Sequence, residues 1–193
     1  MNASALHAIA RHAYESIPPA DDDFDASIIA ILFAAASMEA YIAEVAYHGE
    51  MLSGFSDATT RLADVMEDAE AAHVQVRGKY LLAKALLGGK PFDKGATPFQ
   101  DFEWLIRIRN DIVHMKPDVI KDEPGKVIKF MRGRGLCRPA GEVQMGWLEE
   151  IATRAAARWA CNTAIEITDA LFDMGDAPSP LPFLRNRLGP PVT

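Results

Sequence analysis

Cysteine is scarce in this chain: only Cys137 and Cys161 occur in 193 residues, and neither belongs to a C-x-x-C pair. A disulfide framework is therefore not expected. The sequence instead predicts a reducing, cytosolic setting. Familiar catalytic signatures are missing as well. There is no H-E-x-x-H zinc motif, no G-x-S-x-G motif and no Cys–His nucleophile pattern, and Gly88-Gly89-Lys90 lacks the upstream glycine of a P-loop. The sequence thus predicts no bound metal.

Long hydrophobic runs are also missing. The longest, residues 28–38, contains a serine and is too short to span a bilayer. The first 19 residues have no basic segment followed by an apolar run, so no signal peptide is expected. These features predict a soluble, cytoplasmic protein with no membrane partner.

Positively charged residues are fewer than negatively charged ones, and the net charge is -7. The surface as a whole therefore does not favour nucleic-acid binding. Residues 107–138 are the exception. They hold nine Lys/Arg and four Asp/Glu, a net of +5, while the rest of the chain carries -12. This asymmetry indicates an anionic partner for that segment alone.

Helical periodicity dominates what is present, and no alternating strand pattern of useful length occurs. The fold class expected is all-α, an antiparallel bundle of four to five long helices. The organisation expected is an N-terminal helix in residues 1–20, a helical domain in 21–176 and a proline-rich tail in 177–193, extended along the body or a partner. Helices are predicted over residues 2–16, 25–48, 56–71, 74–89, 98–115 and 143–174, with a short strand or helix at 126–131.

Glycine, proline and small polar residues predict where these helices begin and end. The acidic residues and serine of DDDFDAS (21–27) suit a helix N-terminus, and Thr97 before Pro98 reads as an N-cap followed by proline at the first helical position. Gly49 and Gly175 are predicted helix stops.

The stretch RIRNDIVHMKP (107–117) combines unusual chemistry with a helix end. Asn110 and His114 lie four residues apart and share a helix face, so the amide can hydrogen-bond the imidazole. The last helical turn favours a protonated histidine, and Arg109 offers a bidentate fork. This set suits a phosphodiester.

The arrangement resembles the HEPN superfamily of helical nucleotide-binding and ribonuclease domains. Their R-x-x-x-x-H motif, with a polar residue after the arginine, matches Arg109-Asn110-Asp111-Ile112-Val113-His114. The motif also ends a helix and precedes a loop and a last long helix. A weaker match is Glu39, which follows small residues in an early helix. Motif and helix order together cover about residues 25–174.

The resemblance implies metal-independent, cofactor-free endoribonuclease activity by a homodimer whose motif helices meet at the two-fold axis. His114 would act as general acid or base, Arg109 would bind the scissile phosphate and Asn110 would orient them. The products would carry 2′,3′-cyclic phosphate ends. A toxin or defence role with an antitoxin partner also follows. Substrate RNA would be held by Arg107, Lys116, Lys121, Arg132 and Arg134, with Glu39 in a supporting role.

Less specific interpretations remain open. The motif can be a solvated helix end whose histidine caps its own dipole, or part of a non-catalytic module that binds nucleotide, RNA or a protein, or part of a purely structural dimer. Arg107 and Asp111 are spaced for a weak surface ion pair. Glu39 is more typical of a helix-surface carboxylate, for which a motif-helix arginine could be the partner. Cys137 is expected to be an inert thiol.

Overall fold

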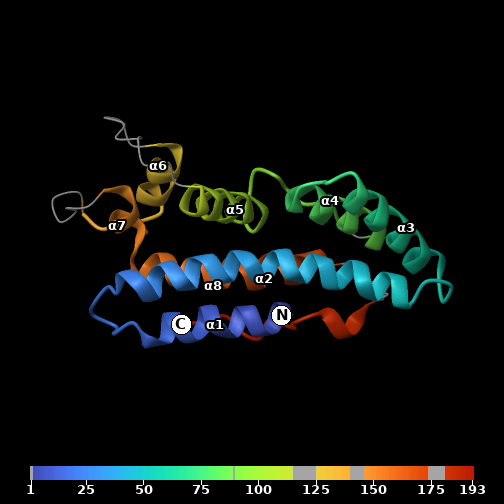
Figure 1. The fold of residues 1–193 in the computed structure, drawn as a ribbon, viewed down its shortest axis with the longest axis horizontal. Helices are drawn as coiled ribbons and strands as arrows, with labels where there is room; N and C mark the ends of the chain where they lie inside the picture. The colour runs from blue at the N-terminus through green and yellow to red at the C-terminus, as the bar shows by residue number, and fades with distance from the viewer. Residues whose placement is uncertain (1, 89, 115–124, 140–145, 174–180) are drawn as a thin grey trace.

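The structure is a computed structural model that describes residues 2–88, 90–114, 125–139, 146–173 and 181–193. Within those ranges it is all-α, as predicted, with no β-strand (Figure 1). The helices are α1 (Ala3–Ser16), α2 (Phe24–Met51), α3 (Asp57–Ala71), α4 (Val76–Leu87), α5 (Phe99–Val113), α6 (Lys126–Gly133), α7 (Trp147–Ile151) and α8 (Arg154–Leu171), followed by a 3-10 turn, η2 (Pro182–Leu184).

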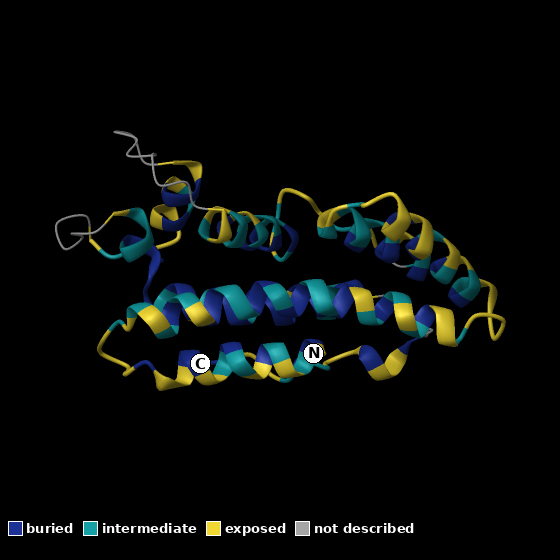
Figure 2. Ribbon diagram, viewed as in Figure 1, coloured by how far each residue is buried: buried dark blue, intermediate teal, exposed yellow. Residues whose placement is uncertain are grey.

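Helix α2 is the centre of the bundle. It packs against α1 along one side and α8 along another, and α3, α4 and α5 contact it as well (Figure 1). Three of its alanines, Ala30, Ala34 and Ala35, are fully buried, which lets neighbouring backbones approach closely. Figure 2 shows buried residues along α2, and α8, which lies behind α2 in this view, has a buried face as well.

By length and composition, α2 is also long and apolar enough to cross a membrane. The apolar pattern continues beyond residue 38, so the prediction that this region is too short was wrong. Half of the apolar window is nevertheless buried by the other helices. That burial is typical of the core helix of a soluble protein.

Polar caps explain the starts of α1, α2, α3 and α8. The side chains of Asn2, Asp23, Ser56 and Thr153 each accept a hydrogen bond from a backbone N–H in the first turn that follows. The acidic segment 21–27 was therefore predicted correctly as a helix N-terminus. Pro98, rather than Thr97, is the N-cap position of α5, and it provides no side-chain hydrogen bond.

Gly49 does not end α2, contrary to the prediction, because the helix continues to Met51. Gly49 is buried, and a Cβ placed on it would lie 3.1 Å from Leu62 Cδ2 of α3. The glycine thus permits a close approach between α2 and α3.

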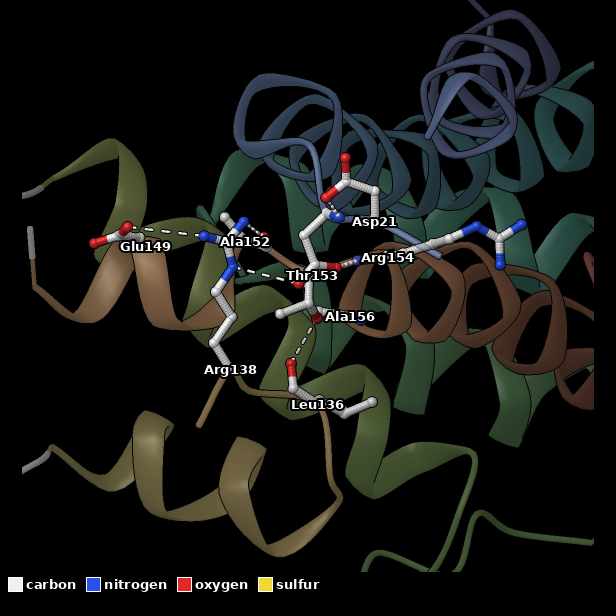
Figure 3. A network of polar contacts seen from close by, with 9 residues as sticks. Asp21, Leu136, Arg138, Glu149, Ala152, Thr153, Arg154 and Ala156 are labelled. Atoms are coloured by element: carbon white, nitrogen blue, oxygen red, sulfur yellow. Dashed lines mark hydrogen bonds and ion pairs between the residues drawn. The ribbon is translucent and has the colours of Figure 1, made fainter. Parts of the chain in front are cut away.

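The predicted single helix over 143–174 is instead two helices, with a break at Ala152 and Thr153 (Figure 3). Thr153 caps α8 through a hydrogen bond from Ala156 N, and its hydroxyl donates to the Leu136 carbonyl at 2.8 Å. Arg138 N donates to the Glu150 carbonyl at 2.8 Å. These contacts to the 136–138 segment fix the break. The predicted start of this helix, residues 143–145, and its predicted stop, Gly175, lie outside the described residues.

The C-terminal tail lies on the body, one of the two predicted positions. Leu181, Leu184 and Leu188 are buried, and Tyr41 of α2 donates to the Leu184 carbonyl at 2.7 Å. Asn162 of α8 exchanges two hydrogen bonds with the backbone of Val192. The tail and α1 therefore share one core with the helices between them.

Candidate functional site

The RNDIVH segment forms the last turns of α5. Phe102, Leu105 and Ile108 are fully buried and face the core, and Arg109 follows on the same side at the edge of that stripe. His114 is the C-cap residue, so the helix ends where the motif predicts. Residues 115–124, which include Pro117, lie outside the described residues.

Arg109 is held by its own chain through both terminal nitrogens. Its Nη2 lies 3.0 Å from Glu39 Oε2 of α2, and its Nη1 donates to Asn110 Oδ1 at 2.8 Å. The Arg109 and Glu39 side chains are 29% and 33% exposed, so the pair lies at the rim rather than in the core. A motif-helix arginine is thus the partner of Glu39, as the sequence suggested.

His114 is exposed and belongs to a different face of α5 from Arg109. It shares the solvent face with Arg107 and Asp111, which are also exposed. Its backbone N–H donates to the Asn110 carbonyl at 2.9 Å. The predicted bond between the Asn110 amide and the His114 ring is not among the hydrogen bonds of the described residues, because the amide oxygen is turned to Arg109.

Arg107 packs on an aromatic ring rather than pairing with Asp111. Its guanidinium carbon lies 5.4 Å from the centroid of Trp104, one turn back on α5. No ion pair joins Arg107 and Asp111, although both residues are described. The predicted weak surface ion pair is therefore wrong, and Arg107 stays available to an external anion.

A groove of about 860 Å³ runs beside α5, bounded by α2, the start of α4 and the loop before α5; we call it the α5 groove. Arg109, Asn110 and Glu39 line it, but His114 does not. Its charged lining is five cations and three carboxylates: Arg77, Lys79, Lys94, Arg107 and Arg109 with Glu39, Glu103 and Asp111. The α5 groove is thus locally positive in an acidic chain.

Much of the predicted basic segment is neutralised by distant carboxylates. Arg132 forms a bidentate pair with the buried Glu150, and Arg134 Nη2 lies 2.8 Å from Oδ1 of the buried Asp101. Because those carboxylates need a partner once buried, these arginines have a structural use in the chain. Neither lines the α5 groove. Lys116 and Lys121 lie outside the described residues.

Metal-binding and thiol chemistry find little support among the described residues. No group of three or more His, Cys, Asp or Glu side chains there could hold a metal ion. Burial raises the pKa of Cys137 to about 12, and that of Cys161 likewise to about 12. Both thiols are therefore protonated near neutral pH, which agrees with the inert role predicted for Cys137.

Several residues of the α5 groove were not predicted from the sequence, among them Lys94 in the loop before α5 and Trp104 on α5 itself. Trp104 is only partly buried and lines the groove. The one sequence signal was the spacing of Trp104 and Arg107 at i, i+3, which places an arginine over an aromatic ring on a helix.

Comparisons with protein-family models, with curated proteins and with solved structures find no match for this chain. The function therefore has to be argued from the geometry of α5 and its groove.

Proposed function

We propose that this protein is a metal-independent endoribonuclease of HEPN type that acts as a homodimer. The observation that carries the proposal is the complete Arg109/Asn110/His114 set at one end of α5, with His114 open to solvent and Arg109 at the edge of a positive groove. In this proposal the protein is cytoplasmic and serves as a toxin or defence effector restrained by an antitoxin.

The chemistry is transesterification within the RNA. The ribose 2′-oxygen attacks the adjacent phosphorus, the bond from phosphorus to the 5′-oxygen breaks, and a 2′,3′-cyclic phosphate and a 5′-hydroxyl result. A proton leaves the 2′-hydroxyl and another reaches the 5′-oxygen, and His114 can serve either transfer. Arg109 stabilises the extra negative charge on the phosphate.

A second copy of the chain completes this scheme. One chain offers one motif histidine, whereas the reaction uses two proton transfers. His114 and Arg109 also lie on different faces of α5, so a site built across a two-fold axis suits them better than a site within one chain. Val113, 55% exposed beside His114, gives the end of α5 an apolar contact for that copy.

A non-catalytic module that binds RNA, nucleotide or protein is the second candidate. The observation that favours it is the engagement of both Arg109 terminal nitrogens by Glu39 and Asn110. An arginine held in this way can position the helix and still leave the groove to bind a ligand without turnover.

Cleavage of labelled single-stranded RNA in excess EDTA separates the two candidates. We expect the wild-type protein to cleave and His114→Ala to lose about 100-fold or more in rate, the usual share of a general acid or base. His12→Ala is the matched control, because His12 is exposed on α1 away from the motif. Thermal unfolding of each variant reports on the fold.

Binding without cleavage by the wild-type protein would favour the second candidate. Loss of both activity and thermal stability in His114→Ala would indicate a structural histidine. A strict monomer in sedimentation equilibrium would contradict the homodimer.

A further inference from the structure

We propose that the α5 groove is a subsite for single-stranded RNA in which Trp104 and Arg107 stack an unpaired base and Lys94 contacts the backbone. The inference deepens the proposed function and rests on it, since it names the substrate class and the residues that hold the strand beside His114.

A continuous stack of side chains carries the inference. The rings of Trp104 and Phe130 of α6 lie 4.6 Å apart and within 13° of parallel. The Arg107 guanidinium lies over the Trp104 ring, 5.4 Å from its centroid, and Arg134 lies 5.4 Å from the Phe130 centroid. Phe130 also contacts Trp159 of α8, so the aromatic part of the stack is anchored to the core.

The outer end of this stack is open. Arg107 is exposed, and nothing among the described residues pairs with its charge. A guanidinium plane and an indole both stack on nucleobases, so a base can lie on Arg107 or displace it from Trp104. Bases within a duplex already stack on their neighbours, which makes an unpaired base the matching ligand.

Charge in the α5 groove suits the phosphates of the same strand. Three of its cations are paired: Arg77 with Glu103, Lys79 with Glu70 and Arg109 with Glu39.

Within the described part of the chain, Lys94 and Arg107 form no ion pair, and both line the groove. Asp111 is an exposed carboxylate in the same lining and opposes an anion. Asp111→Asn should therefore strengthen RNA binding.

The distance along α5 links this subsite to the motif. His114 follows Arg107 by seven residues on the same solvent face, about 10 Å along the helix axis. A short strand seated on Arg107 can therefore extend to His114. An acidic protein would meet the same cations, but it would not use a stacking platform, so the aromatic stack favours RNA.

The test measures binding of a short, labelled single-stranded RNA to the full-length His114→Ala protein by fluorescence anisotropy over a range of salt. Arg107→Ala should weaken binding about tenfold, the lower part of the range for loss of one stacked base. Lys94→Ala should lower the slope of log affinity against log salt by about 0.7, one phosphate contact. Arg158→Ala, an exposed arginine of α8 outside the groove, should change neither quantity.

Stacking itself has a direct optical signal. RNA should quench part of the tryptophan fluorescence, and Trp104→Phe should abolish that part while keeping an aromatic ring against Phe130. Circular dichroism checks that each variant is folded.

Four results would overturn the inference: no RNA binding, unchanged RNA binding in both Lys94→Ala and Arg107→Ala, equally tight binding of duplex RNA, or equally tight binding of a polyglutamate peptide through the same residues. The ribonuclease proposal fails in a different way. If RNA binding depends on the groove residues but the wild-type protein does not cleave, the subsite is supported and the ribonuclease proposal is contradicted. If the protein cleaves RNA but binding does not depend on the groove residues, the ribonuclease proposal is supported and the subsite is contradicted.

Discussion

The pair between Glu39 and Arg109 makes a prediction in which stability and function change in opposite directions. If Arg109 binds the scissile phosphate, it has to give up part of its contact with Glu39, which now competes for the same guanidinium. Glu39→Gln keeps the size of the side chain and removes its charge. We therefore expect weaker folding but tighter RNA binding.

The magnitude follows from the geometry. The two side chains are 3.0 Å apart and about one third exposed, so solvent screens much of their attraction. The net worth of such a pair is about 1 kcal/mol, and the free energy of unfolding should fall by about that amount. The same energy released to a phosphate corresponds to an affinity about fivefold higher.

Urea unfolding measures the first quantity, and RNA anisotropy in the His114→Ala background measures the second. Glu103→Gln is the matched control, because Glu103 lines the same α5 groove but pairs with Arg77. Weaker RNA binding in Glu39→Gln would refute the competition. An equal gain in Glu103→Gln would assign the effect to net charge alone.

Three further predictions concern the core. Burial, with a smaller contribution from Arg11, lowers the pKa of His7 to about 4 from its ordinary 6.5, so the unfolded chain takes up a proton that the folded protein excludes. Stability should therefore be lost as pH falls from about 6.5 towards about 4, by up to about 3 kcal/mol in urea unfolding, and His7→Leu should flatten that dependence. Gly49→Ala should destabilise by about 1 kcal/mol despite the better helix former, because the new Cβ would crowd Leu62. Iodoacetamide at pH 8 should alkylate Cys137 and Cys161 about a hundredfold more slowly in the native protein than in urea, since burial keeps both thiols protonated.

Each of these predictions has a clear contradiction. A wild-type stability that does not change between pH 6.5 and pH 4, or the same pH dependence in His7→Leu, would show that another group titrates. A stabilised Gly49→Ala protein would show that Leu62 moves aside at no cost. Rapid native alkylation would show that the thiols are open to solvent.

Local sequence patterns predicted the helices well, because each long helix has an apolar stripe and most have a polar cap. The acidic start of α2 and the serine before α3 are signals contained in a few residues. The break before α8 was missed because it depends on Leu136 and Arg138, which reach Thr153 and Glu150 from a distant segment. Gly49 was wrongly predicted to end α2 for a similar reason, since its role depends on contact with Leu62 of α3.

The candidate site was predictable only along α5. The motif and the partnership of Glu39 with a motif arginine could be inferred, because both follow from helix order and charge. The ion pairs of Arg132 and Arg134 could not be inferred, because their carboxylate partners lie on α7 and at the start of α5. Lys94 and Trp104 were missed because a groove is a property of packed helices.

The ends of the RNA products test the central claim most directly. Single-stranded RNA should be incubated with the wild-type protein and with His114→Ala in excess EDTA, and the fragments analysed by mass spectrometry. The account predicts 2′,3′-cyclic phosphate and 5′-hydroxyl ends with the wild-type protein and intact RNA with the variant. Intact RNA in both, or the same fragments in both, would contradict it.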